Sequence, residues 1–190
     1  MLKKNILAAA FVLGSALVSA HAAAQVSYFG GSVGRAKWNF DCAGSTSCHT
    51  AAASWKLYGG YEFSPNFGVE GSYIYLNEVG ASDSALKATF NGRGADLAAI
   101  VKTTPMNNFV GFAKLGVAFM KGEIVASTRD FAASETHYSG QPLISLGALY
   151  YVDKKIAIRA EVDHRRVKVS GFTQTTSGVT NFSIGVQSEF

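Results

Sequence analysis

Two cysteines in a short polar segment carry the most specific chemistry in the sequence. Cys42 and Cys48 lie six positions apart, and His49 follows the second cysteine. In an exported protein, this spacing favours a local disulfide that closes a loop. The alternative is a metal site, but two thiols and one imidazole lack a nearby fourth ligand and match no standard zinc spacing. We therefore expect a disulfide, no metal and no other cofactor.

A histidine and a serine two residues apart could belong to a nucleophilic enzyme. His137 precedes Ser139, and Glu135 is near them in sequence, but no acidic residue can be assigned to orient the imidazole. Such enzymes need an activated nucleophile, and a triad is recognised by its geometry. The pattern favours a histidine on a surface loop. We expect no enzymatic activity, with a lipid A-modifying enzyme as the remaining alternative.

Charged side chains recur at alternate positions of otherwise apolar segments. Arg159, Glu161 and Asp163 show this spacing. Because an unpaired buried ion is costly, charges on an inward face should pair with one another. The predicted lumenal cluster comprises Glu62, Glu70, Lys114, Arg159, Glu161 and Asp163, and Lys56 and Lys102 share its parity.

The elements that would position these charges are β-strands. From 54 to 63, apolar and polar residues alternate with a period of two, and the tight turn 64–66 leads to a second alternating segment, 67–75. The same hairpin pattern recurs twice. The predicted strands are 26–36, 54–63, 67–75, 95–102, 109–119, 143–151, 156–164 and 179–190. Segment 95–102 could also form a helix, but seven strands would leave an unpaired edge. The fold class is all-β, a transmembrane antiparallel up-and-down barrel of eight strands.

The two faces of these strands differ in composition. One face carries aromatic residues such as Trp55, Tyr73, Phe109 and Phe182, whereas the other carries mainly glycine, serine and the charges above. A soluble calyx would carry long charged residues outside, so the pattern favours a membrane barrel with aromatic girdles. Long polar segments 37–53, 77–93, 121–138 and 165–178 alternate with short turns, as in outer-membrane barrels.

The N-terminal segment has the features of a secretory signal peptide. Lys3 and Lys4 precede an apolar run that is too short to span a bilayer, and alanines follow it. We expect residues 1–24 to be removed and 25–190 to form one domain, with a retained anchor helix as the alternative. Removing both lysines lowers the net charge from +4 to +2, and we expect no nucleic-acid partner.

The last strand places four apolar side chains on one face. They are Phe182, Ile184, Val186 and Phe190. The arrangement resembles the C-terminal signal that the outer-membrane assembly machinery recognises, although Ser188 stands where a bulky apolar residue is usual.

Segments 57–70 and 112–117 resemble the OmpA-like family of eight-stranded outer-membrane barrels, which includes OmpX-, Ail- and NspA-like proteins. The family serves differing purposes on one fold. The resemblance implies an ionic cluster that blocks or gates a lumen, with Glu70, Lys114 and Arg159 at matching positions. A further acidic position is occupied by Leu149, which argues against a gated pore.

These features predict a monomeric outer-membrane surface protein of a Gram-negative bacterium. The barrel would anchor four extracellular loops for adhesion or for contact with host molecules or lipopolysaccharide, since function is commonly carried by loops on a rigid scaffold. Arg165, Arg166 and Lys168 form a predicted rim for lipopolysaccharide phosphates, with an ordinary solvated rim of charged residues as the alternative. The expected partners are outer-membrane lipid, the assembly machinery and host surface ligands. A low-conductance porin is the main alternative.

Overall fold

The computed structural model describes residues 26–39, 47–82, 87–127, 132–170 and 174–190. These residues form nine strands, and they contain no helix that is long and apolar enough to cross a membrane. The predicted signal peptide, Cys42 and the side chain of Cys48 lie outside the described part, so the disulfide stays a prediction. The strands are β1 (Val26–Trp38), β2 (Ser47–His49), β3 (Ala51–Ser64), β4 (Phe67–Ser82), β5 (Lys87–Lys102), β6 (Phe109–Ser127), β7 (Ala132–Tyr151), β8 (Ile156–Ser170) and β9 (Gln174–Glu189).

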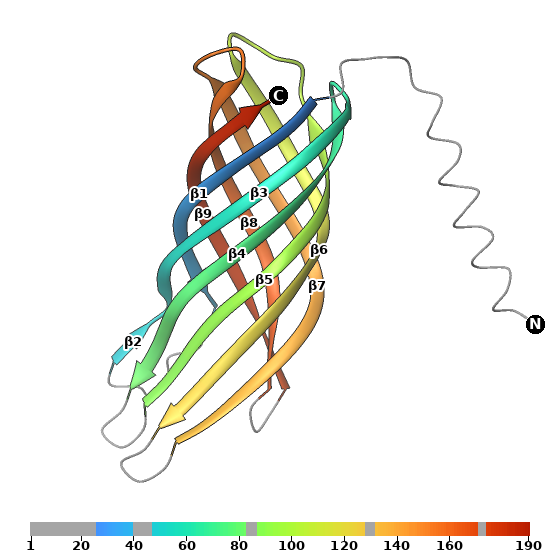
Figure 1. The fold of residues 1–190 in the computed structure, drawn as a ribbon. Coiled ribbons are helices and arrows are strands. Elements are labelled where there is room, and N and C mark those ends of the chain that lie inside the picture. Colours follow the sequence, from blue (N-terminus) through green and yellow to red (C-terminus); the bar gives the residue numbers. More distant parts are fainter. Residues whose placement is uncertain (1–25, 40–46, 83–86, 128–131, 171–173) are drawn as a thin grey trace, which may run out of the picture.

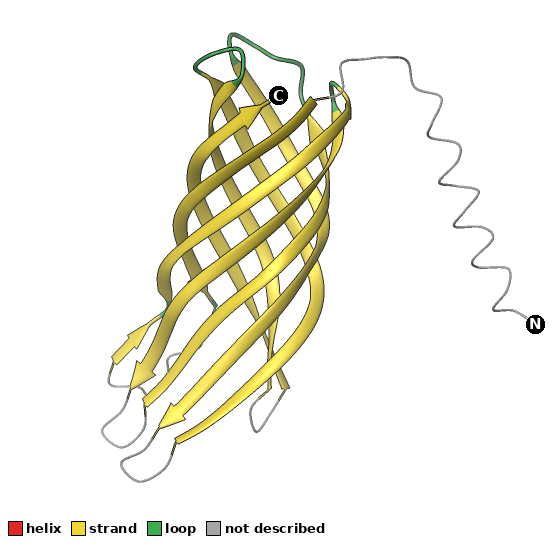
Figure 2. Ribbon diagram, in the orientation of Figure 1, coloured by secondary structure: helices red, strands yellow, loops and turns green. Residues whose placement is uncertain are grey.

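Eight long strands close into an antiparallel barrel (Figures 1 and 2). Each is paired with its neighbour around the wall, β9 pairs with β1, and β4 pairs with β5. The short β2 adds three residue pairs to β4 where β3 has not yet begun. Closure leaves no long strand with an unpaired edge, which a bilayer would penalise heavily. The predicted eight-stranded barrel is confirmed, and segment 95–102 is a strand.

The two ends of the barrel differ. Turns 65–66, 103–108 and 152–155 lie at one end together with the C-terminus, at the top of Figure 1. We call this the turn end. The opposite end, where β6 stops at Ser127 and β7 begins at Ala132, is called the loop end.

The strands extend further toward the loop end than their alternation predicted. Segment 121–138 was expected to be a loop, but β6 and β7 pair continuously from Phe109 with Tyr150 to Ser127 with Ala132. Segments 77–93 and 165–178 are also largely strand. Their apolar residues are few and are interrupted by polar residues and glycines, so these stretches lack the regular apolar alternation that marks a strand in the sequence. Their backbone hydrogen bonds continue the ladder nevertheless.

The side chains on the outer face are apolar and exposed across the middle of the barrel. Leu97, Leu115 and Ile184 expose 62%, 67% and 59% of their surface. A calyx in water would bury such residues, whereas a barrel in lipid presents them. The aromatic residues flank this band, with Phe67 and Phe109 toward the turn end.

The lumen is filled in three layers, and β8 crosses all of them. Its inward residues run from Ala157, through four charged residues between 159 and 165, to Val167. The turn-end apolar layer consists of Ile100, Val110, Phe112, Leu149 and Ala157. The loop-end apolar layer consists of Ala36, Trp38, Ile74, Leu76, Val79, Ala98, Ala118, Met120, Leu143, Val167 and Val179. An ionic network lies between the two layers.

Candidate functional site

The ionic network is built around one carboxylate on β4. Glu70 accepts a hydrogen bond from the Tyr28 hydroxyl at 2.8 Å and from Lys114 Nζ at 2.7 Å. Arg159 donates to both of its oxygens, at 2.7 Å from Nη1 and 3.1 Å from Nη2. Strands β1, β4, β6 and β8 therefore meet through a single side chain. Such charge-assisted bonds are among the stronger hydrogen bonds in proteins.

The network continues along β8 toward the loop end. Glu161 pairs with Lys114 and with Lys56, the latter at 2.9 Å, and Lys56 also reaches Asp163 at 3.0 Å. Four acidic and four basic side chains take part, so the formal charges balance. The network consists of Lys56, Glu70, Asp96, Lys114, Arg159, Glu161, Asp163 and Arg165.

Aromatic rings hold Arg159 from two sides. Its guanidinium carbon lies 4.2 Å from the centre of the Tyr58 ring and 4.4 Å from that of Phe112. The rings need room that glycine provides, because a Cβ at Gly30 would lie 2.5 Å from the Tyr58 hydroxyl oxygen and one at Gly147 would lie 2.7 Å from Phe112 Cε1. The small residues on the inward face therefore accommodate the rings that pack against the arginine.

The predicted lumenal cluster divides into two parts. Glu70, Lys114, Arg159, Glu161 and Asp163 lie in the network. Glu62 does not. It pairs with Lys102 at the turn end, where Glu189 approaches the same ammonium group at 3.8 Å.

The expectation that Arg165 lies on an exposed rim is wrong. Its side chain is fully buried and pairs with Asp96 at 3.0 Å and with Asp163 at 3.6 Å. β8 continues to Ser170, so residue 165 keeps the inward parity of 157–163. Arg166 is exposed on the outer face, and the side chain of Lys168 lies outside the described part.

Asp96 and Arg165 are the two members of the network that sequence reasoning missed. Each lies an even number of positions from a residue on the same strand that was predicted to point inward: Asp96 from Lys102, and Arg165 from Asp163. Asp96 lies within the predicted strand 95–102, so strict alternation from Lys102 would have found it, whereas Arg165 required extending the predicted strand 156–164 by one residue. What the alternation could not supply is their pairing, since β5 and β8 are not adjacent in the wall.

The four apolar residues assigned to an assembly signal lie on the outer face of β9. Phe182, Ile184, Val186 and Phe190 are all more than half exposed. Phe190 also donates a backbone hydrogen bond to the Ser27 carbonyl at 2.9 Å, which extends the pairing of β9 with β1. Their recognition by the assembly machinery stays a prediction.

Neither the metal nor the enzyme alternative gains support from the described residues. They include no group of three or more histidine, cysteine or acidic side chains that could hold a metal ion. Ser139 Oγ is buried and has no hydrogen-bond partner in this part of the chain. The side chain of His137 lies outside it.

Comparisons with known proteins agree with this architecture. Among solved structures, Neisserial surface protein A has a TM-score of 0.62 at 14% identity, covering 86% of this chain and 97% of that one. Ail of Yersinia pestis has a TM-score of 0.57 at 15% identity, covering 86% and 99%. OprG from Pseudomonas aeruginosa has a TM-score of 0.54 at 14% identity, covering 90% and 97%. No curated protein matches the sequence.

A family model supplies the assignment. The model of the OmpA-like transmembrane domain matches residues 22–183, most of the chain. The aromatic girdles, the apolar outer band and the closed antiparallel wall are the features that this kind of membrane domain requires. The chain belongs to the OmpA-like transmembrane domain family and is an eight-stranded barrel of the Gram-negative outer membrane.

Proposed function

We propose that the protein is a non-enzymatic surface protein whose barrel anchors and raises its loops for contact with ligands outside the cell. The observation that carries this proposal is the length of the strands at the loop end. β6 and β7 contain 19 and 20 residues, whereas a tilted strand needs roughly 9–11 residues to cross a bilayer.

The excess length lies on one side of the membrane band. Phe119, an exposed aromatic residue at the edge of that band, pairs with Gly140. Beyond this rung, the pairing continues from Met120 with Ser139 to Ser127 with Ala132. Eight further residues at roughly 3.3 Å each would extend the wall about 26 Å along the strands. A hairpin of this length can hold its tip clear of the lipid headgroups.

The filled lumen favours an anchor over the porin alternative. An eight-stranded barrel is only wide enough for its own side chains, and here an ionic network lies between two apolar layers. A solute would have to break the ion pairs and also cross both apolar layers. We therefore carry no second function forward.

The ligand class that the loop end suits best is anionic. Ail, which shares the fold, was solved in complex with sucrose octasulfate, a heparin analogue. Basic residues are frequent at or near the loop end of this chain, and a sulfated polysaccharide is the first ligand to test. They include Lys37, Lys87, Arg166 and Lys168.

The test compares the folded protein with two shortened variants. In the first, an Asn-Gly turn replaces 123–136, so that Lys121 with Tyr138 and Gly122 with His137 remain paired. In the second, all four loop-end connections are shortened. The matched control shortens turn 103–108 at the other end. Binding to immobilised heparin and to cultured cells is measured for each.

We expect both loop-end variants to lose binding and the turn-end control to retain it. Folding is verified independently by heat-modifiable electrophoretic mobility. Equal binding by the full-length protein and a folded variant with all four loops shortened would overturn the proposal, as would the absence of binding by the full-length protein.

A further inference from the structure

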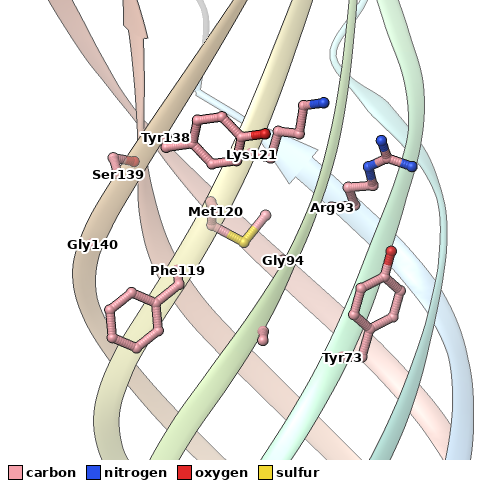
Figure 3. Close-up of a pocket in the computed structure, with 10 residues that line it drawn as sticks. Tyr73, Arg93, Gly94, Phe119, Met120, Lys121, Tyr138, Ser139 and Gly140 are labelled. Carbon is pink, nitrogen blue, oxygen red and sulfur yellow. The ribbon is translucent and has the colours of Figure 1, made fainter.

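A groove on the outer wall crosses four strands near the edge of the membrane band. It has a volume of about 470 Å³ and runs over β4, β5, β6 and β7. Figure 3 shows Arg93, Lys121 and Tyr138 toward one end of it and the rings of Phe119 and Tyr73 toward the other. The groove therefore joins a basic region to an apolar one.

The apolar part arises from one rung of the sheet in which large and small residues alternate. Tyr73 pairs with Ala95, Ala95 with Phe119, and Phe119 with Gly140. The rings of Tyr73 and Phe119 therefore alternate with the small residues Ala95 and Gly140, which leave gaps between them. A gap of this shape, on a surface that faces lipid, suits an acyl chain.

The basic part is the next rung toward the loop end. Along it Tyr75 pairs with Arg93, Arg93 with Lys121, and Lys121 with Tyr138. The Lys121 ammonium group lies 5.7 Å from the centre of the Tyr138 ring. Two cations thus stand directly opposite each other, flanked by tyrosines, just beyond the aromatic edge of the band.

This pair of cations lacks a compensating carboxylate within the described part of the chain. No ion pair joins either Arg93 or Lys121 to an acidic side chain there, and Glu123, two residues further along β6, does not reach Lys121. Like charges directly opposite each other destabilise a sheet. An anion between them would relieve the repulsion.

We propose that this groove binds a phosphorylated lipid of the outer leaflet, with a phosphate between Arg93 and Lys121 and an acyl chain over Ala95 and Gly140. Arginine and lysine are the usual phosphate ligands. The basic rung lies beyond the aromatic edge, where headgroups begin. The site is on the wall, below the part removed in the loop-end variants, and its existence does not depend on the loop function proposed above.

Native mass spectrometry of the folded protein in detergent, titrated with diphosphorylated lipid A, tests the site. The double variant Arg93→Ala/Lys121→Ala removes the phosphate ligands. We expect its affinity for lipid A to be at least about tenfold lower, because at least one charge-assisted contact is lost. Dephosphorylated lipid A should bind wild type and double variant equally weakly.

A second variant tests the acyl-chain part with the charges intact. A Cβ at Gly140 would lie 3.6 Å from Phe119 Cε1, an ordinary contact, so a side chain can start at this position, and Gly140→Phe places a ring in the groove. We expect it to weaken lipid A binding at least about fivefold, because the acyl chain can no longer pack against the apolar surface of the groove. Inorganic phosphate should not displace the lipid from wild type.

The control is Arg35→Ala, which removes a single exposed arginine from the opposite wall. Arg35 is exposed on β1, and its neighbours across the sheet are Ala53 and Phe182, neither of them a cation. We expect less than about a twofold change, because a lone exposed charge contributes little. Three results would each overturn the proposal: unchanged binding by the double variant, unchanged binding by Gly140→Phe, or displacement of the lipid by phosphate.

Discussion

At the scale of single residues, Glu70 connects the interior of the barrel. Its two oxygens accept hydrogen bonds from Tyr28, Lys114 and Arg159, on three different strands. Burying charges is expensive, and a buried ion pair is not by itself evidence of stability. Removing one partner from a completed network is a different matter, because it leaves the others buried and uncompensated.

The substitution Glu70→Gln should therefore destabilise the protein strongly. It keeps the size of the side chain but removes the charge that Lys114 and Arg159 share, and breaking a buried pair in this way costs about 3–5 kcal/mol. The free energy of unfolding by urea in lipid vesicles measures the effect. The exposed Glu78→Gln is the control and should change stability by no more than about 0.5 kcal/mol. Equal effects of the two substitutions would contradict this role for Glu70.

At the scale of elements, the hairpin between β5 and β6 ends in a turn with a strict backbone requirement. Met106 and Phe109 exchange two backbone hydrogen bonds, at 2.8 and 2.9 Å. Between them Asn107 and Asn108 have φ values of 48° and 69°. Two successive residues with positive φ are what a two-residue hairpin turn of type I′ needs, and asparagine tolerates this conformation better than most residues.

A β-branched residue in this turn should impair the hairpin. Asn107→Val is expected to cost about 1–2 kcal/mol, because a side chain branched at Cβ crowds the backbone at positive φ, which asparagine tolerates, whereas Asn107→Gly should retain wild-type stability. Urea unfolding and the rate of folding into vesicles provide the measurement. Thr104→Val, in the same exposed connection but without a positive φ, is the control. Wild-type behaviour of Asn107→Val would show that the turn does not constrain the barrel.

At the scale of the whole molecule, closure gives a wall without long free edges around a lumen that is filled by side chains over the described part of the chain. Apolar layers lie on both sides of the ionic network, and Gln187 links Arg159 of the network to Glu189 at the turn end through hydrogen bonds of 3.2 and 3.0 Å. Outside, the exposed apolar band fits the bilayer, and the wall continues beyond it at the loop end.

Planar-bilayer recordings should show no steady conductance for the wild-type protein. Glu70→Ala and Lys114→Ala should stay silent as well, because each leaves both apolar layers in place. Adding Leu143→Ser and Leu149→Ser to Lys114→Ala makes each layer more polar, and this combination should conduct intermittently. A steady wild-type current would contradict the filled lumen as a barrier and would return the porin to consideration.

The amino-acid sequence by itself determined the number of strands in the wall, their alternating faces and most of the inward charges. These follow from a period of two, which is a local property: Arg159, Glu161 and Asp163 share a face whatever they pair with. The same rule, applied throughout strand 95–102 and one residue beyond strand 156–164, would also have placed Asp96 and Arg165 inside.

Only the tertiary structure decided which charges meet. Glu70 and Arg159 are separated by 89 residues, and Arg165 joins Asp96 across the lumen. Such contacts depend on the stagger of every strand around the closed wall, and a single strand carries no record of that stagger. Backbone pairing within the hairpin set the lengths of β6 and β7, because hydrogen bonds extend a ladder even where the side chains show no regular apolar alternation. The groove beside Arg93 and Lys121 arises in the same way, from four strands in register.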